Sequence, residues 1–429
     1  MPASRVVAET DSETALGWSR SLIVGGTLVA LMSANAGVRG AFSNFFIPLL
    51  EQLGTSRTSL SASFTVSRVV LGVVQPFLGK VLDRHGPAAV IVPSTIALAA
   101  GFLLLPFSSQ LWHVYALYGV LMAVGLAGTS SSIGFPIAVQ WFRKQRSLIL
   151  GILGAAGMLG TLAIVPGSMF LLLNLGWPQT CVLLAIASVL VALPVMIGFL
   201  PKARPTEAAR LVRPGTGSIA EPGSATGVTR APVSQLGISQ LLQNRTFWLL
   251  VVPTCASGTS GTLVQVHFVP LMLDQGQSPQ VAANALGVIA AIGIAGVLAG
   301  GVFAYRLGEK NILTSLYLLR GAGMLLLPFA GGTVALYLSV LLVGLSWGGV
   351  QPMTGGVVGD SFDRGAMGTV IGWIFSIQNV VGALGAILGG AAHDWTGHYD
   401  VAFYLSGAFL FVGATLTFMI RTRPPAGVN

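Results

Sequence analysis

The chain has 429 residues, of which 53% are hydrophobic and only 8% are charged, and its mean hydropathy is +0.81. A soluble chain carries about 25% charged residues, so this composition excludes a soluble globular protein. The 56 glycines and 22 prolines exclude a fibrous helical rod, whereas transmembrane helices tolerate both residues. The net charge of +9 raises the question of nucleic acid until the basic residues are placed relative to a bilayer.

Twelve apolar segments are long enough to cross a membrane, because a hydrocarbon core of about 30 Å needs roughly 20 helical residues. The joins near residues 110 and 331 are so short that neighbouring helices must form antiparallel hairpins. The sequence therefore predicts an all-α integral membrane protein. The predicted spans are 22–49, 58–82, 88–108, 111–139, 147–175, 178–200, 246–273, 280–305, 311–331, 332–359, 365–391 and 399–420.

A polar segment divides the spans into two sets of six. Residues 201–245 are basic and rich in Pro and Gly, which is typical of a linker that cannot bury enough apolar surface to fold. The predicted organisation is an N-terminal tail, a six-helix bundle, the linker, a second six-helix bundle and a C-terminal tail. These parts cover 1–21, 22–200, 201–245, 246–420 and 421–429.

Most of the 22 Lys and Arg fall in the tails, the linker and alternate loops. Cytoplasmic loops hold the excess of basic residues, so both termini are expected in the cytoplasm of a multi-pass protein of the inner (cytoplasmic) membrane. Topology accounts for the positive charge, and no nucleic-acid partner is needed to explain it.

The two halves resemble each other. Residues 79–86 (GKVLDRHG) follow the second span, and residues 301–308 (GVFAYRLG) follow the eighth. A half-length repeat in a membrane protein is typical of transporters built from two bundles around a central site.

The first of these loops resembles the G-x-L-a-D-R-x-G-R motif of the major facilitator superfamily. Gly79, Asp83, Arg84 and Gly86 match it, although Pro87 replaces the last base. The resemblance implies twelve transmembrane helices in two pseudo-symmetric six-helix bundles that work by alternating access. It also implies that these loop residues latch the cytoplasmic side through bases such as Arg143, with Arg306 in the second copy.

Within that superfamily, residues 141–160 (WFRKQRSLILGILGAAGMLG) are similar to the segment that enters helix five of monocarboxylate and oxalate/formate-type transporters. Gly37, Arg39 and Phe42 fit a helix-one pattern of many bacterial relatives. Val297 stands where that family often has an Arg in helix eight, and the helix-eleven Lys of the oxalate type is missing. The resemblance implies transport of a monocarboxylate-like organic anion, as proton symport or anion exchange.

Three arginines fall within predicted spans: Arg39, Arg68 and Arg320. Arg39 and Arg68 lie about ten residues from the outer surface, hence about 15 Å deep, where a charge is costly unless it faces a polar site. Guanidinium groups pair with carboxylates, so both are candidate anion ligands, and a structural arginine bonded to backbone is the alternative for each. Arg320 lies nearer the cytoplasm, where its side chain could extend to the surface, and a structural role is the favoured prediction for it.

Polar side chains add to the candidate site. Asn35 and Ser43 share a helical face with Arg39, being one turn before and after it. The fourth, seventh, tenth and eleventh predicted spans contribute the remaining candidates, each of which has an alternative structural role in helix packing. These are Ser131, Gln265, His267, Trp347, Gln351 and Asn379.

Other functions stay open at this point. Proton-coupled efflux of drugs or other amphipathic solutes is the main alternative, although Leu121 stands where drug antiporters of the superfamily usually have an Arg. Residues 258–261 resemble the G-x-S-G of intramembrane serine proteases, and a non-transporting receptor is also possible. The favoured prediction is a monomeric carrier, not an enzyme, with no cofactor and no metal.

Overall fold

The computed structural model describes residues 3–142, 146–199, 238–362 and 367–420. Every regular element in these ranges is helical. The N-terminal half contains α1 (Ala3–Leu53), α2 (Arg57–His85), α3 (Ala88–Leu104), η1 (Leu105–Phe107), α4 (Leu111–Val114), η2 (Tyr115–Met122), α5 (Ala123–Gly128), α6 (Ser131–Trp141), α7 (Arg146–Leu175) and α8 (Trp177–Phe199).

The C-terminal half repeats this arrangement after the short helix α10 (Ile238–Gln243). Its other elements are α11 (Arg245–Asp274), α12 (Pro279–Leu307), α13 (Glu309–Leu326), η3 (Leu327–Phe329), α14 (Thr333–Trp347), α15 (Val350–Ser361), α16 (Met367–Thr396) and α17 (Asp400–Phe418).

Ten segments of the described chain are long and apolar enough to cross a membrane. Two more long helices complete the set: α1, which carries Arg39, and α8, whose apolar part is Trp177–Leu193. The all-α membrane fold predicted from the sequence is confirmed. The boundaries differ in two places, because α1 already begins at Ala3 and because α10 and the start of α11 lie within the predicted linker.

The fourth and tenth spans are each divided in two, in contrast to the continuous helices predicted. One consists of α4, η2, α5 and α6, with a break at Thr129 and Ser130, and the other of α14 and α15, with a break at Gly348 and Gly349. The helices α2 and α12 both end at a glycine with a left-handed backbone conformation: Gly86 has φ 84° and Gly308 has φ 81°. Left-handed φ values of this kind favour glycine, so the two repeat motifs stop their helices by the same device.

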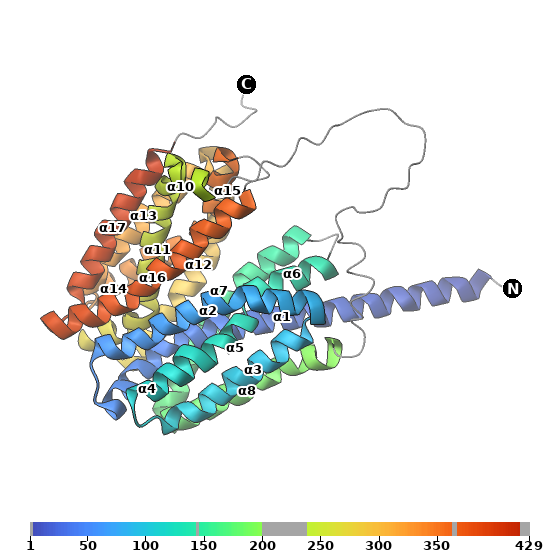
Figure 1. Ribbon diagram of the computed structural model, residues 1–429, viewed down its shortest axis with the longest axis horizontal. Helices are drawn as coiled ribbons and strands as arrows, with labels where there is room; N and C mark the ends of the chain where they lie inside the picture. Colours follow the sequence, from blue (N-terminus) through green and yellow to red (C-terminus); the bar gives the residue numbers. More distant parts are fainter. Residues whose placement is uncertain (1–2, 143–145, 200–237, 363–366, 421–429) are drawn as a thin grey trace.

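The two bundles form a V (Figure 1). They diverge toward the side that carries α6, α10 and α15, called here the terminal side because α1 starts from it, and they meet toward the far side, where α1 connects to α2. Contacts between α2 and α16 follow this shape. A Cβ on Gly390 would lie 2.7 Å from the Thr58 backbone, and Thr65 Oγ1 donates to the Ala383 carbonyl oxygen at 2.9 Å.

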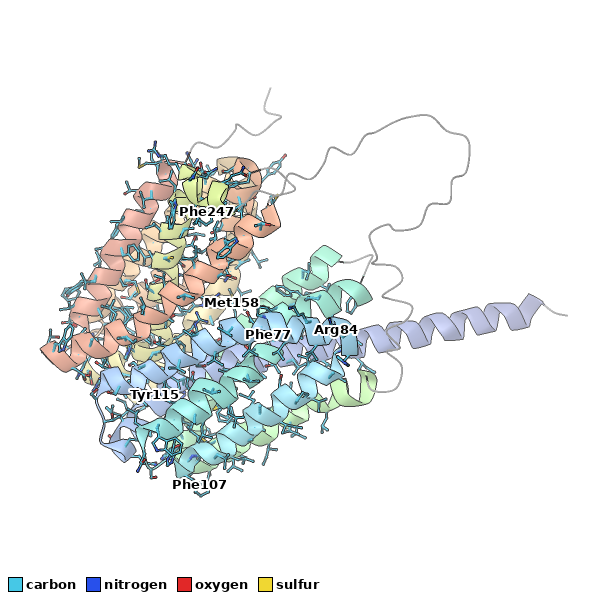
Figure 2. All side chains as sticks on the ribbon, in the orientation of Figure 1. Phe77, Arg84, Phe107, Tyr115, Met158 and Phe247 are labelled. Carbon is cyan, nitrogen blue, oxygen red and sulfur yellow. The ribbon has the colours of Figure 1, made fainter. Side chains whose placement is uncertain are left out.

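Closer to the terminal side, the same faces of these two helices lie apart. A Cβ added at Gly72, Gly79 or Gly372 would meet nothing within 4 Å. The packing of α7 against α12 ends in the same way, because Met158 contacts Gly293 whereas Gly154 and Gly301 have open space. Figure 2 shows Met158 between the two bundles. The transmembrane domain is therefore closed at the far side and open toward the terminal side.

Within the N-terminal bundle, α1 and α7 are in close contact. Ser33 Oγ donates to the Ala156 carbonyl at 2.7 Å, and a Cβ at Gly160 would overlap the backbone of Ser33. The absence of a side chain at Gly160 thus allows the two backbones to approach, as small residues do in membrane bundles. Both cysteines, Cys181 and Cys255, are free and buried.

This contact gives a stability prediction. Gly160→Ala should destabilise the bundle by about 1–3 kcal/mol, because the added methyl group has only backbone to displace. Gly167→Ala is the matched control on the same helix, since a Cβ there has open space, and it should be neutral or slightly stabilising. Thermal unfolding of the purified protein measures both, and an equal effect of the two substitutions would contradict the packing described.

Candidate functional site

Arg39 lies on α1 at the apex of the V. Ser43, one turn nearer the far side, makes the hydrogen bonds that join α1 to α11: its hydroxyl donates to the Val266 carbonyl at 3.1 Å and accepts from the Val269 N–H at 3.2 Å. Four residues earlier, Arg39 occupies nearly the same helical face, one turn beyond these contacts. It is partly exposed. The arginine therefore lies where the two bundles begin to separate.

Arg68 lies in a corresponding place on α2, just beyond a contact between α2 and α16. The hydrogen bond of Thr65 to Ala383 lies one turn nearer the far side, and Arg68 follows it by three residues. The antiparallel register of α2 and α16 puts Val380 and Asn379 opposite Arg68. Two helices of the N-terminal bundle thus each direct an arginine toward the start of the opening.

Neither arginine has a partner among the described residues. No hydrogen bond or ion pair of either side chain is found there, and Arg68 Nε is buried without an acceptor. The two guanidinium groups are close enough to repel each other. Tyr118 of η2 lies near both arginines, and its ring stacks on that of Phe42 at a centroid distance of 4.1 Å.

A pair of unpartnered cations inside a membrane domain is a candidate binding site for an anion. The low dielectric makes such charges costly, and they persist where a ligand or water compensates them. The arrangement offers guanidinium groups, which bind carboxylates through two parallel hydrogen bonds.

The C-terminal bundle contributes polar, uncharged groups to the other side of the apex. Gln265, next to Val266 on α11, is half-buried and its Oε1 atom has no hydrogen-bond partner. Asn379 is half-buried, and its amide donates to the Phe375 carbonyl of its own helix at 2.8 Å. Trp347 ends α14 at the break in the tenth span and is also half-buried. Arg39, Arg68, Gln265, Asn379 and Trp347 are called the apex site below.

The remaining predicted ligands lie differently. Asn35 is only 2% exposed and donates to the Leu126 carbonyl and to Thr129 Oγ1, at the break in the fourth span. Ser43 is fully buried in the contact with α11. Ser131 and Gln351 are exposed, on α6 and α15, toward the terminal side of the apex. Their roles as ligands stay predictions, and the amide of Asn35 and the hydroxyl of Ser43 already have protein partners.

His267 is fully buried on the closed side of the apex. Its Nε2 lies 2.8 Å from the Ala386 carbonyl oxygen and 3.2 Å from Ser61 Oγ, and its Nδ1 has no partner. The Ser61 hydroxyl itself donates to the Arg57 carbonyl. Nε2 must therefore carry the hydrogen and donate, because a carbonyl oxygen only accepts. In this conformation His267 joins the two bundles.

A polar cluster closes the far side, and it was not among the residues selected from the sequence. Arg57 NH1 donates to Asp274 Oδ2 at 3.0 Å and to the Tyr399 hydroxyl at 2.7 Å, while the Asp394 carboxylate accepts from the backbone N–H groups of Arg57 and Thr58 at 3.2 and 2.9 Å. We call these five residues the far-side lock. Burial raises the pKa of the Tyr399 phenol, so its hydroxyl stays neutral.

The lock joins the start of α2 to three positions in the C-terminal bundle. His393 extends it, with Nε2 3.3 Å from Asp274 Oδ2. Only the excess of acids in the far-side loops hinted at it in the sequence, because residues that are 217 and 337 positions apart cannot be paired without the fold.

Arg320 does not extend to the surface and is held inside the C-terminal bundle. Its side chain is 3% exposed and bonds to Ser257 Oγ at 2.7 Å and to the carbonyls of Ser346 and Trp347 at 3.1 and 3.2 Å. These two carbonyls lie at the end of α14, where intrahelical partners are missing, so burying the guanidinium there satisfies both sides. Its charge centre also lies 5.1 Å from the centroid of the Trp347 ring.

The predicted cytoplasmic latch stays a prediction. Arg84 and Arg306 are exposed at the terminal side, where Figure 2 shows Arg84, and Gly79 and Gly86 lie at the end of α2. The side chain of Asp83 and all of Arg143 lie outside what the structure describes.

Two bundles that are closed at one side and open at the other, with polar groups at the apex, define a membrane carrier. Residues 23–386 match the Major Facilitator Superfamily, and the chain belongs to this family. It is a multi-pass membrane transporter, and the resemblance read from the loop motif is confirmed.

Several curated relatives have similar sequences. The uncharacterized MFS-type transporter YcxA of Bacillus subtilis is 27% identical over 84% of this chain and 85% of its own length. Monocarboxylate transporter 13 of Rattus norvegicus is 26% identical over 88% and 83%, and the oxalate:formate antiporter of Oxalobacter formigenes is 22% identical over 91% and 90%.

A solved structure has the same fold. The bacterial homolog to the human lysosomal transporter Spinster, in an inward-facing and unoccupied conformation, is 14% identical and has a TM-score of 0.69. The match covers 93% of this chain and 96% of that one.

The different surroundings of Arg39 and Arg320 predict opposite effects on stability. Arg320→Met should destabilise the protein by about 3 kcal/mol, because it leaves buried carbonyls without donors. Arg39→Met should leave thermal stability unchanged or raise it, because the arginine it removes has no partner. Unfolding temperatures of the two variants in the same detergent check this. Equal destabilisation would mean that Arg39 is structural.

The far-side lock predicts a conformational shift. Arg57→Ala should increase the population that is open at the far side roughly fivefold, the effect of about 1 kcal/mol from a partly exposed ion pair. Spin labels at the exposed residues Glu51 and Trp395 report the separation of the bundles. Asp400→Asn is the control, since it removes an acid of the same side that forms no ion pair with any described residue. An unchanged distance distribution in Arg57→Ala would contradict the idea that the far-side lock holds the two bundles together.

Proposed function

We propose that the protein is a secondary active transporter that moves a small organic anion across the cytoplasmic membrane by alternating access. The observation that carries the proposal is Arg39, a cation without a partner among the described residues, at the point where the two bundles separate. A carboxylate is the anion that a guanidinium recognises best among metabolites of this size. The relatives that carry monocarboxylate or oxalate and formate in their names support the same class.

The direction of the opening is part of the proposal. The excess of Lys and Arg in the tails, linker and terminal-side loops supports a cytoplasmic location for both termini. The V then opens to the cytoplasm, and the far-side lock closes the outer side. The protein would act as a monomer in the inner membrane.

The transport cycle follows from the two sets of contacts. In the outward-open state the far-side lock is broken and the apex site is reached from outside. An anion that binds between Arg39 and the polar groups of the C-terminal bundle holds the bundles together and allows the lock to form. The predicted latch of Asp83 and Arg84 with basic residues near Arg143 would close the cytoplasmic side in the other half of the cycle.

Coupling is either proton symport or exchange of one anion for another. His267, His393, Asp274 and Asp394 are titratable groups that lie between the bundles, and these four belong to the closed far side. Exchange needs no titratable group in the apex site itself. Uptake of a labelled anion with and without a pH gradient distinguishes the two modes.

Counterflow in proteoliposomes tests the proposed function. A panel of labelled carboxylates should include at least one that is transported by the wild type, and Arg39→Gln should weaken its apparent affinity by about tenfold or more, because it removes the charge that binds the anion. A variant that keeps full affinity would exclude Arg39 as the anchor. Transport of amphipathic cations instead of anions would favour the alternative, proton-coupled drug efflux.

The latch has its own test. Asp83→Asn should slow transport several-fold while the affinity for the anion stays within about twofold, because the substitution changes the stability of one closed state and not the apex site. Lys80→Gln is the control for a charge change at the same end of α2. Unchanged transport rates in Asp83→Asn would contradict the latch.

A further inference from the structure

The apex site contains one more cation than a single carboxylate needs. Arg39 and Arg68 both reach it from the N-terminal bundle, and none of the described acids pairs with either arginine. Asp274 and Asp394 belong to the far-side lock. The C-terminal bundle adds only uncharged groups to the apex, because its own buried Arg320 is already bonded to serine and backbone oxygens.

The two arginines also depend on each other. They lie near enough to repel, and Arg68 Nε is buried without an acceptor. A monocarboxylate that binds to Arg39 would leave the charge of Arg68 uncompensated within the membrane domain. An anion with two carboxylates would neutralise both guanidinium groups and remove their mutual repulsion.

We propose that Arg68 determines the specificity of the carrier by binding a second carboxylate, so that its preferred substrate is a small dicarboxylate. This inference rests on the anion transport proposed above. Arg39 binds one carboxylate and Arg68 the other, and each can be held bidentately. Gln265 and Asn379, on the side of the second bundle, carry no charge that would compete with the anion for the two arginines.

Counterflow competition with two anions of equal chain length tests this. Butanoate and butanedioate differ only in the second carboxylate. For the wild-type protein, butanedioate should compete at a concentration at least about tenfold lower than butanoate, which corresponds to about 1.4 kcal/mol.

Variants assign that preference to Arg68. Arg68→Gln should weaken the apparent affinity for butanedioate by about tenfold and change that for butanoate by no more than about threefold. Arg39→Gln should weaken the apparent affinity for both anions. Arg68→Lys keeps a point charge but loses the bidentate geometry, so it should reduce the preference for butanedioate by about threefold. It also serves where Arg68→Gln is poorly folded, as judged by size-exclusion chromatography.

The outcomes separate this inference from the transport function on which it rests. Carboxylates that are transported without preference for butanedioate, or an Arg68→Gln variant that weakens both anions equally, would overturn the role of Arg68 and leave anion transport standing. Failure of the wild type to bind or transport any carboxylate would overturn both.

Discussion

The structure depends on the cost of placing charge in a membrane. An arginine away from water must find acceptors, and the chain solves this in two opposite ways. Arg320 is enclosed by serine and backbone oxygens, where it completes the end of a broken helix. Arg39 and Arg68 have no acceptor among the described residues, and both lie where the bundles part. The same residue type is therefore bonded within the protein in one bundle and is left without a protein acceptor, as a candidate binding group, in the other.

Much of the fold was predictable because the bilayer imposes a length and a polarity on each helix. The twelve spans, the division into halves and the repeat at Gly86 and Gly308 follow from hydropathy and from positions that only glycine favours. The breaks in the fourth and tenth spans were not predictable. They depend on Asn35 and Arg320, which satisfy backbone carbonyls from other helices, and such partners are not visible in a linear pattern.

The candidate site could be selected only in part from the sequence. Depth alone selected Arg39 and Arg68, since a charge near the middle of a span needs a reason. Depth could not show that Asn35 faces the fourth span, nor that Ser43 faces α11, although both share a helical face with Arg39. It did separate Arg320 from the other two arginines, but it could not name the serine and backbone oxygens that hold the Arg320 side chain. The far-side lock escaped because Arg57, Asp274 and Asp394 look like ordinary loop charges until the two bundles are brought together.

The Asp394 carboxylate receives the first two backbone N–H groups of α2, a helix of the opposite bundle. These groups have no partner within their own helix. When the far side opens, the start of α2 must give up this cap and be hydrated. The amide hydrogens of Arg57 and Thr58 should then exchange with solvent mainly while the far side is open. The exchange rates of these two amide hydrogens would thus measure, without any label, how often the far side of the carrier opens.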